Sequence, residues 1–392
     1  MENLSDETAD FLKEIESLNV SRVVYSIQVM LRYFSLLFAL SLFHSSASAQ
    51  DPTFDDVARF VAGKQLSPAS PLRRLEGLPS VRRHITESNA LSKTWQDRRL
   101  SVLRDWAKAE IHPRISRPKF IKYPFSGPDF VHAATLFPGA DEYILAGLES
   151  LGTLPNFLAM SDPDLDAYLT HLNHTLRSIS QRSFFITTEM REDFGKQGVD
   201  GVYPVLLYFA ALTNHEVIKG QFIKLSESGE AVVSLDPTTA DGIWLQIRAT
   251  DRLPDFPPTQ SLYYFKTDLS DAGFKANSPM KDFLDQRPGG MGYLKAASYL
   301  MHTPDFTNIR NFLVGDCQYL LQDESGIPAE FFATYYNTTY YGNYVGPIDM
   351  FKEFYQPFLA QVYQSGAAKP LNFGTGYRMK DSDAIQMFGI RK

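Results

Sequence analysis

The sequence predicts an α/β fold, namely a three-layer, Rossmann-like mixed sheet that follows an N-terminal helical part. Short apolar runs of strand length alternate with segments whose apolar residues recur at helical spacing, as in a chain of βαβ units. The dipeptide Ser228-Gly229 separates two further strand-like runs and indicates a hairpin, so part of the sheet should be antiparallel. With 44% hydrophobic and 21% charged residues, the 392-residue chain has an ordinary globular composition.

Residues 1–49 predict an export signal. Residues 33–43 form an uncharged apolar run that is too short to cross a bilayer as a helix, which needs roughly 20 residues. Arg32 precedes this run, and Ala47-Ser48-Ala49 follows it as a small-residue cleavage site. We therefore expect cleavage before Gln50 and a soluble protein in the periplasm or outside the cell, with no integral membrane segment after removal of the signal.

Two features of this region leave alternatives open. The residues ahead of Met30 are rich in acids, which is the wrong charge for the start of a signal, so Met30 is a candidate for the true start. Residues 9–43 also fit an amphipathic helix or a membrane anchor, although Arg32 interrupts the apolar stretch.

The mature chain is expected to consist of a helical part, residues 50–117, and an α/β domain, residues 118–392. In the helical part, apolar residues recur at helical spacing among dense charges between positions 79 and 110. The α/β domain begins with a predicted strand at 120–125.

The first three elements of this domain predict a βαβ unit. Residues 127–137 predict a short helix between the strand at 120–125 and a buried strand at 143–148. Because this connection accommodates one crossover helix, the two strands should be parallel neighbours. The remaining pattern predicts helices at 161–178, 203–213, 279–286, 293–302 and 306–314, and strands at 184–188, 217–225, 230–235, 244–249, 262–265 and 317–321.

The expected helix at 293–302 carries a set of polar residues. Lys295, Ser298, Tyr299 and His302 share one face of a helix by their three- and four-residue spacing. Such a face lines a pocket or packs in the core with satisfied hydrogen bonds, and the second interpretation is the more common one.

Seven segments carry a resemblance to a known family. In order between positions 123 and 377, they are YPFSGPDF, YILAGLE, LYYFKTDLS, LKAASYLMH, LQDESGIP, YVGPI and FGTGY. With these segments the chain resembles a family of exported bacterial proteins that has no assigned activity. The resemblance implies export and a shared domain but no catalytic residues.

The opening of the domain is also similar to that of a Rossmann-like methyltransferase. A strand, a Ser-Gly-Pro-Asp turn and a helix precede a strand that ends in Gly-Leu-Glu. However, the GxGxxG pattern is absent, and Pro128 and Asp129 occupy positions where small residues let a cofactor approach. Export also places the protein where NAD and S-adenosylmethionine are not supplied, so we expect no cofactor.

Polar residues that follow predicted strands are the candidate ligand-binding residues, because ligands of open α/β sheets bind at the carboxyl ends of the strands. They are Ser126 and Asp129 after the first strand, Glu149 after the second, and Asp323 after the strand at 317–321; Asp268 follows the strand at 262–265, the fourth such place. Structural interpretations stay open: Ser126 and Asp129 have the spacing of a capping box, and Glu149 and Asp323 fit solvated strand ends.

The predicted function is therefore the binding of a small polar ligand at the carboxyl edge of the sheet. The alternatives are a hydrolase or transferase that uses these carboxylates, and a non-catalytic structural protein of the cell envelope.

Several kinds of chemistry lack a complete motif in the sequence. No nucleophile motif is complete, so catalytic residues stay unassigned. Asp162-x-Asp164-x-Asp166 lacks the glycine and glutamate of a calcium loop, so no metal is expected. A net charge of -7 without a basic run argues against nucleic acid, and the single Cys317 excludes an internal disulfide. The sequence leaves the oligomeric state open.

Overall fold

The structure is a computed structural model that describes residues 51–182 and 201–392. Residues 52–392 form one compact unit. The predicted export signal and the predicted strand at 184–188 lie outside the described residues.

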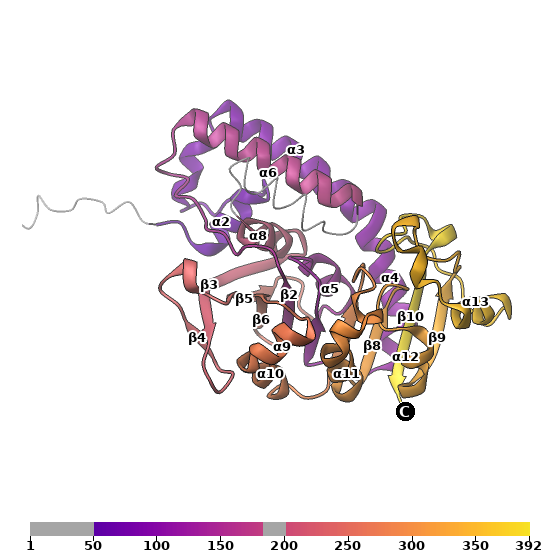
Figure 1. The fold of residues 1–392 in the computed structure, drawn as a ribbon. Coiled ribbons are helices and arrows are strands. Elements are labelled where there is room, and N and C mark those ends of the chain that lie inside the picture. The colour runs from indigo at the N-terminus through magenta and orange to yellow at the C-terminus, as the bar shows by residue number, and fades with distance from the viewer. Residues whose placement is uncertain (1–50, 183–200) are drawn as a thin grey trace, which may run out of the picture. The chain divides into compact units, whose positions relative to one another are not determined.

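The described residues form a mixed α/β fold with one ten-stranded sheet (Figure 1). Its strand order is β4-β3-β5-β6-β2-β1-β7-β8-β10-β9. The five central strands, β6-β2-β1-β7-β8, pair in parallel, and the remaining pairs are antiparallel. The strands are β1 Phe120–Tyr123, β2 Glu142–Gly147, β3 His215–Leu225, β4 Ala231–Val233, β5 Gly242–Ala249, β6 Gln260–Lys266, β7 Met291–Leu294, β8 Tyr319–Gln322, β9 Tyr336–Gly342 and β10 Ile385–Arg391.

Two predicted pairings are confirmed. Strands β1 and β2 are parallel neighbours, with Tyr123 opposite Leu145, and helix α5 (Phe130–Leu136) connects them. Strands β3 and β4 pair as an antiparallel hairpin across Ser228-Gly229.

Helices precede the sheet and connect its strands. Helices α3 and α6 lie side by side (Figure 1). A short π-helical segment, Gln96–Leu100, joins α3 to α4. Besides α5, the α-helices of the described residues are α2 Phe54–Val61, α3 Pro79–Trp95, α4 Ser101–Glu110, α6 Asp162–Arg182, α8 Tyr203–Leu212, α9 Asp271–Ala276, α10 Ser278–Asp285, α11 Thr307–Asp316, α12 Ala329–Tyr335 and α13 Pro357–Gln364.

The two faces of the central sheet pack into different hydrophobic cores. In β2, Tyr143 and Leu145 belong to the core that contains residues of α2, α3, α4, α5, α6 and α8, whereas Ile144 and Ala146 belong to the core that contains residues of α9 to α13. This alternation follows from the two-residue period of a strand. Because both faces are covered, β2 is an almost continuous apolar run.

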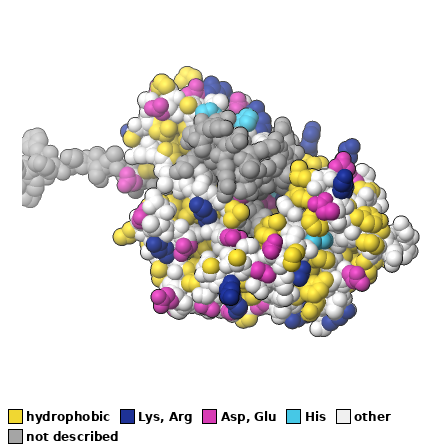
Figure 2. Space-filling model, viewed as in Figure 1, with side chains coloured by type: hydrophobic (Ala, Val, Ile, Leu, Met, Phe, Trp, Pro, Cys, Tyr) yellow, Lys and Arg dark blue, Asp and Glu magenta, His cyan; other side chains and the backbone are white. Residues whose placement is uncertain are grey.

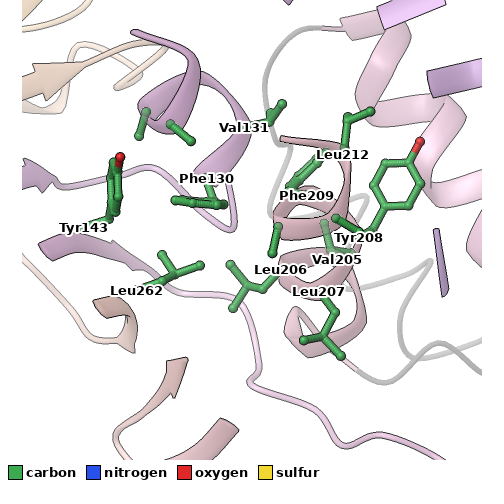
Figure 3. Packing of buried hydrophobic residues seen from close by; sticks show 14 of the residues in the cluster. Phe130, Val131, Tyr143, Val205, Leu206, Leu207, Tyr208, Phe209, Leu212 and Leu262 are labelled. Carbon is green, nitrogen blue, oxygen red and sulfur yellow. The ribbon is translucent and has the colours of Figure 1, made fainter. Parts of the chain in front are cut away.

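Helix α8 has an apolar sequence and is buried along its whole length. Figure 3 shows Phe130 of α5 between Tyr143 of β2 and the α8 side chains Leu206 and Phe209. The rings of Phe130 and Tyr143 meet edge to face at 5.0 Å. This packing fixes α5, and with it the turn between β1 and α5.

The predicted helix at 293–302 is wrong. Residues 291–294 form β7, a fully buried strand between β1 and β8, and the chain then enters a tight loop. Periodicity does not separate a short buried strand from a buried helix, which explains the error. Lys295, Ser298, Tyr299 and His302 therefore do not share a helix face.

The view in Figure 2 shows basic and acidic side chains interspersed with hydrophobic ones among the described residues of that face. No helix within residues 51–182 and 201–392 is long and apolar enough to span a bilayer.

Candidate functional site

A pocket of about 130 Å³ lies at the carboxyl ends of four adjacent parallel strands, β6, β2, β1 and β7. We call it the Glu149 pocket. From β1 the chain continues to β2 on one side, and it later returns to β7 on the other side of β1, so the direction in which strands are added reverses at β1. Ligands of open α/β sheets bind at such a switch point. The pocket is lined by Phe125, Gly127, Gly147, Leu148, Glu149, Thr267, Asp268, Leu269, Ala296, Ala297, Ser298, Leu300 and Phe306.

The backbone around this pocket adopts an uncommon conformation. Phe125, Ala296, Ser298 and Tyr299 have φ values between 52° and 57°, in the left-handed region that side chains other than glycine disfavour. They are four of the five such non-glycine residues in the described part of the chain. The first three line the pocket, so the unfavourable conformations concentrate at one place.

Glu149 is buried, with 4% of its surface exposed, and it lines the pocket. The hydroxyl of Tyr264 on β6 donates a hydrogen bond of 2.9 Å to its Oε2. A β-carbon at Gly147 would collide with this carboxylate, so the glycine lets the carboxylate lie against the end of β2.

Ser126 joins the ends of β1 and β2. Its hydroxyl donates 2.8 Å and 3.3 Å hydrogen bonds to the carbonyls of Gly127 and Ala146, and accepts one of 3.2 Å from the Ala146 amide. The capping-box interpretation is wrong, because Asp129 is itself the N-cap of α5 and accepts from the amide of His132.

Asp129 is the centre of a buried group of polar side chains, which we call the Asp129 cluster: Tyr123, Asp129, His132 and Lys295. Oδ2 of Asp129 lies 2.6 Å from Lys295 Nζ and accepts a 2.7 Å hydrogen bond from Tyr123, while Oδ1 lies 2.6 Å from His132 Nδ1. All four side chains are less than 10% exposed. A buried carboxylate needs such partners, because an unpaired charge is costly to bury.

The charges in this cluster set its protonation. Burial opposes ionisation of Asp129, but His132 and Lys295 outweigh it and hold the pKa of this carboxyl well below its ordinary value. Burial lowers the pKa of His132 more than Asp129 raises it, and it lowers that of Lys295 in the same way. The lowered pKa favours a neutral imidazole at pH 7. Its Nδ1 lies 2.6 Å from Asp129 Oδ1 and 3.2 Å from Lys295 Nζ, and the contact with the carboxylate favours the tautomer that carries its proton on Nδ1.

His132 also lines a second pocket, of about 440 Å³, which we call the Arg99 pocket. Its lining contains three cations, Arg98, Arg99 and Lys380, and one acid, Asp381. The full lining is Arg98, Arg99, Leu103, His132, Asn372, Phe373, Gly374, Met379, Lys380 and Asp381.

The acids after β8 are buried as well. Asp323 is fully buried and accepts hydrogen bonds from the amide of Ala296 at 2.8 Å and from the amide and hydroxyl of Ser325 at 2.9 Å and 2.5 Å. Glu324 is 3% exposed, and its Oε2 has no hydrogen-bond partner among the described residues. Burial and the neighbouring Asp323 raise the pKa of Glu324 to about 8.

The four predicted residues thus lie at one edge of the sheet but in different environments. Glu149 lines the pocket, Ser126 joins two strand ends, Asp129 is ion-paired, and Asp323 holds the loop after β7. Sequence reasoning missed His132 as a partner of Asp129, although their three-residue spacing on α5 was a usable signal.

No three His, Cys, Asp or Glu side chains in the described ranges are grouped so that they could hold a metal ion. Comparisons of the chain with family models, curated proteins and solved structures give no significant match. The resemblance to a family of exported proteins therefore stays a prediction.

Proposed function

We propose that the Glu149 pocket binds a small hydroxylated ligand, such as a sugar or a polyol. The concentration of left-handed residues around the pocket carries this proposal, since strained backbone is retained mainly where function requires it. A carboxylate such as Glu149 accepts hydrogen bonds from neighbouring hydroxyl groups of a ligand. Thr267 and Ser298, on the pocket lining, add hydroxyls of their own.

The strand order supports this assignment. The order β6-β2-β1-β7-β8 corresponds to 3-2-1-4-5 of the doubly wound, Rossmann-like folds, and the two hydrophobic cores agree with a three-layer arrangement. In such folds an acid about 20 residues after the first strand binds ribose hydroxyls. Glu149 has this place in the chain, at the end of the second strand.

The volume limits the ligand. A cavity of about 130 Å³ corresponds to about four waters at ~30 Å³ each, so it accommodates a single sugar ring or part of one. The test is isothermal titration calorimetry of the purified chain with ribose, glucose and glycerol, each compared with a deoxy analogue.

Binding of a hydroxylated compound should weaken at least tenfold in Glu149→Gln, which keeps the size of the side chain but removes its charge. Glu230→Gln, at an exposed carboxylate next to β4, is the matched control and should bind like the parent. Absence of binding by every compound, or equal affinity of the Glu149 variant and the parent, would overturn the proposal.

A second candidate function, phosphoester hydrolysis, is supported by the Asp129–His132 pair beside the Arg99 pocket. Asp129 orients the imidazole, and Nε2 is the nitrogen left to take a proton from water. The water oxygen would form a bond to phosphorus while the bond to the leaving oxygen breaks. The leaving oxygen would depart as the oxyanion or take the proton from the His132 imidazolium. Arg98 and Arg99 supply positive charge for the phosphate.

The assay for this candidate is release of nitrophenolate from p-nitrophenyl phosphate. His132→Gln should abolish turnover, and His174→Gln, at an exposed position of α6, should leave it unchanged. If the parent protein is no faster than the His132 variant, the Asp129 cluster has a structural role only.

A further inference from the structure

A pocket of about 460 Å³ lies at the opposite edge of the sheet from the Glu149 pocket. We call it the amino-edge pocket, because its walls come from segments that precede strands: Arg117 and Pro118 before β1, residues 137–139 before β2, and residues 253–256 before β6. Helix α4, together with His112 and Ile115 after it, supplies the remaining wall. The volume falls in the roughly 300–1,000 Å³ range of small-molecule sites.

The inner walls of this pocket are mainly apolar. Phe137 is buried, Pro138 adjoins it, and Phe256 packs against Gly139, where a β-carbon would collide with its ring. Leu253 is 56% exposed at the outer wall. An exposed leucine beside an apolar hollow is a surface that a ligand with an apolar body would cover.

Positive charge lies at the rim. Arg104 and Lys108 are one helical turn apart on α4, and both are exposed. Neither has an ion-pair partner among the described residues, whereas Arg117 is paired with Asp141. One acid, Asp255, also lines the pocket, so the lining stays net positive.

We propose that the amino-edge pocket binds a small amphipathic anion, with its apolar body against Phe137 and Phe256 and its anionic head at Arg104 and Lys108. Apolar walls with a few charged groups that fix orientation are the usual composition of a ligand site. The length of the parallel strands separates this pocket from the Glu149 pocket, and the two share no lining residue.

The test is calorimetric titration of the purified chain with decanoate, decanol and decyltrimethylammonium, all below their aggregation concentrations. We expect decanoate to bind at least tenfold more tightly than decanol, and the cation not to bind. The double variant Arg104→Gln/Lys108→Gln should lose this preference while its weak affinity for decanol is unchanged, which shows that the pocket is intact.

Two further variants sharpen the result. Leu253→Asp, at an exposed wall position that leaves the core untouched, should weaken decanoate binding at least tenfold. Arg82→Gln/Lys93→Gln on α3 makes the same charge change outside the pocket and should bind like the parent.

Equal affinity for decanoate and decanol, or decanoate binding that is unaffected by the α4 double variant, would overturn the proposal. So would binding only to phosphatidylglycerol vesicles and not to monomeric decanoate, since that result indicates a membrane-facing surface. The variant Glu149→Gln should bind decanoate like the parent, which separates this site from the sugar site.

Discussion

The burial of Glu324 predicts that the free energy of unfolding depends on pH, and the raised pKa of this carboxyl sets the size of the effect. Its pKa is raised from an ordinary value of 4.5 to about 8, so the folded protein keeps a proton that the unfolded chain releases above pH 4.5. The contribution of Glu324 to stability is therefore complete below pH 4.5 and is lost as the pH rises to about 8. At ~1.4 kcal/mol per pH unit, this loss is at most roughly 5 kcal/mol.

The variant Glu324→Gln stays neutral at every pH and escapes this loss. At pH 5 it should unfold at nearly the same urea concentration as the parent, and at pH 9 it should be more stable by several kcal/mol. For a unit of this size, such a difference raises the melting temperature by about 10 °C. Urea and thermal unfolding between pH 5 and 9 measure both quantities.

The control is Glu330→Gln, at an exposed position of α12, which should change stability by less than about 0.5 kcal/mol at each pH. Asp323 lies beside Glu324 and has a raised pKa for the same reason, burial. Because Asp323 is present in both proteins, the difference between them mainly reports Glu324. A variant-minus-parent difference that is the same at pH 5 and pH 9 would refute a protonated Glu324.

Three further outcomes follow from the candidate site. Lys295→Met leaves Asp129 buried without its ammonium partner and should lower the free energy of unfolding in urea by about 3–5 kcal/mol. The double variant with Asp129→Asn should recover part of this loss, and no recovery would contradict the pairing. Because the folded pKa of Asp129 lies below its ordinary value of 3.8, its contribution is complete above that pH and is lost as the pH falls, so Asp129→Asn should reduce the acid sensitivity of unfolding. Ser126→Ala removes the hydroxyl that joins β1 to β2 and should lower the free energy of unfolding by about 1 kcal/mol, and an unchanged urea midpoint would show that these hydrogen bonds contribute nothing.

The sequence predicted those elements that local pattern determines. The β1-α5-β2 unit has apolar strands on either side of a turn sequence, and the β3-β4 hairpin has a clear turn signal. The order of the strands in the sheet could not be predicted from the sequence, because β1 pairs with β7, which lies more than 160 residues later along the chain. Strand β7 itself was mistaken for a helix, since its buried run continues into the apolar Ala296-Ala297.

The same contrast between local pattern and long-range pairing explains which site residues could be predicted from the sequence. Glu149 was found because it directly follows a strand that local pattern identifies. Lys295 also directly follows a strand, but the incorrect helix concealed that fact. His132 was missed because the sequence offered a capping role for Asp129. Only the long-range pairing of β1 with β7 brings Lys295 to the same carboxylate.

Several costly features coincide at the carboxyl edge. Left-handed residues border the ends of β1 and β7, a buried ion pair joins α5 to the end of β7, and the buried Glu324, whose pKa is raised, follows β8. Each of these costs stability relative to an apolar or glycine alternative. Proteins depart from local rules chiefly at functional sites, where another benefit offsets the loss. A purely structural envelope protein has no reason to concentrate such departures at one edge, and at the switch point of the sheet in particular. The distribution therefore favours a binding or catalytic role over a structural one.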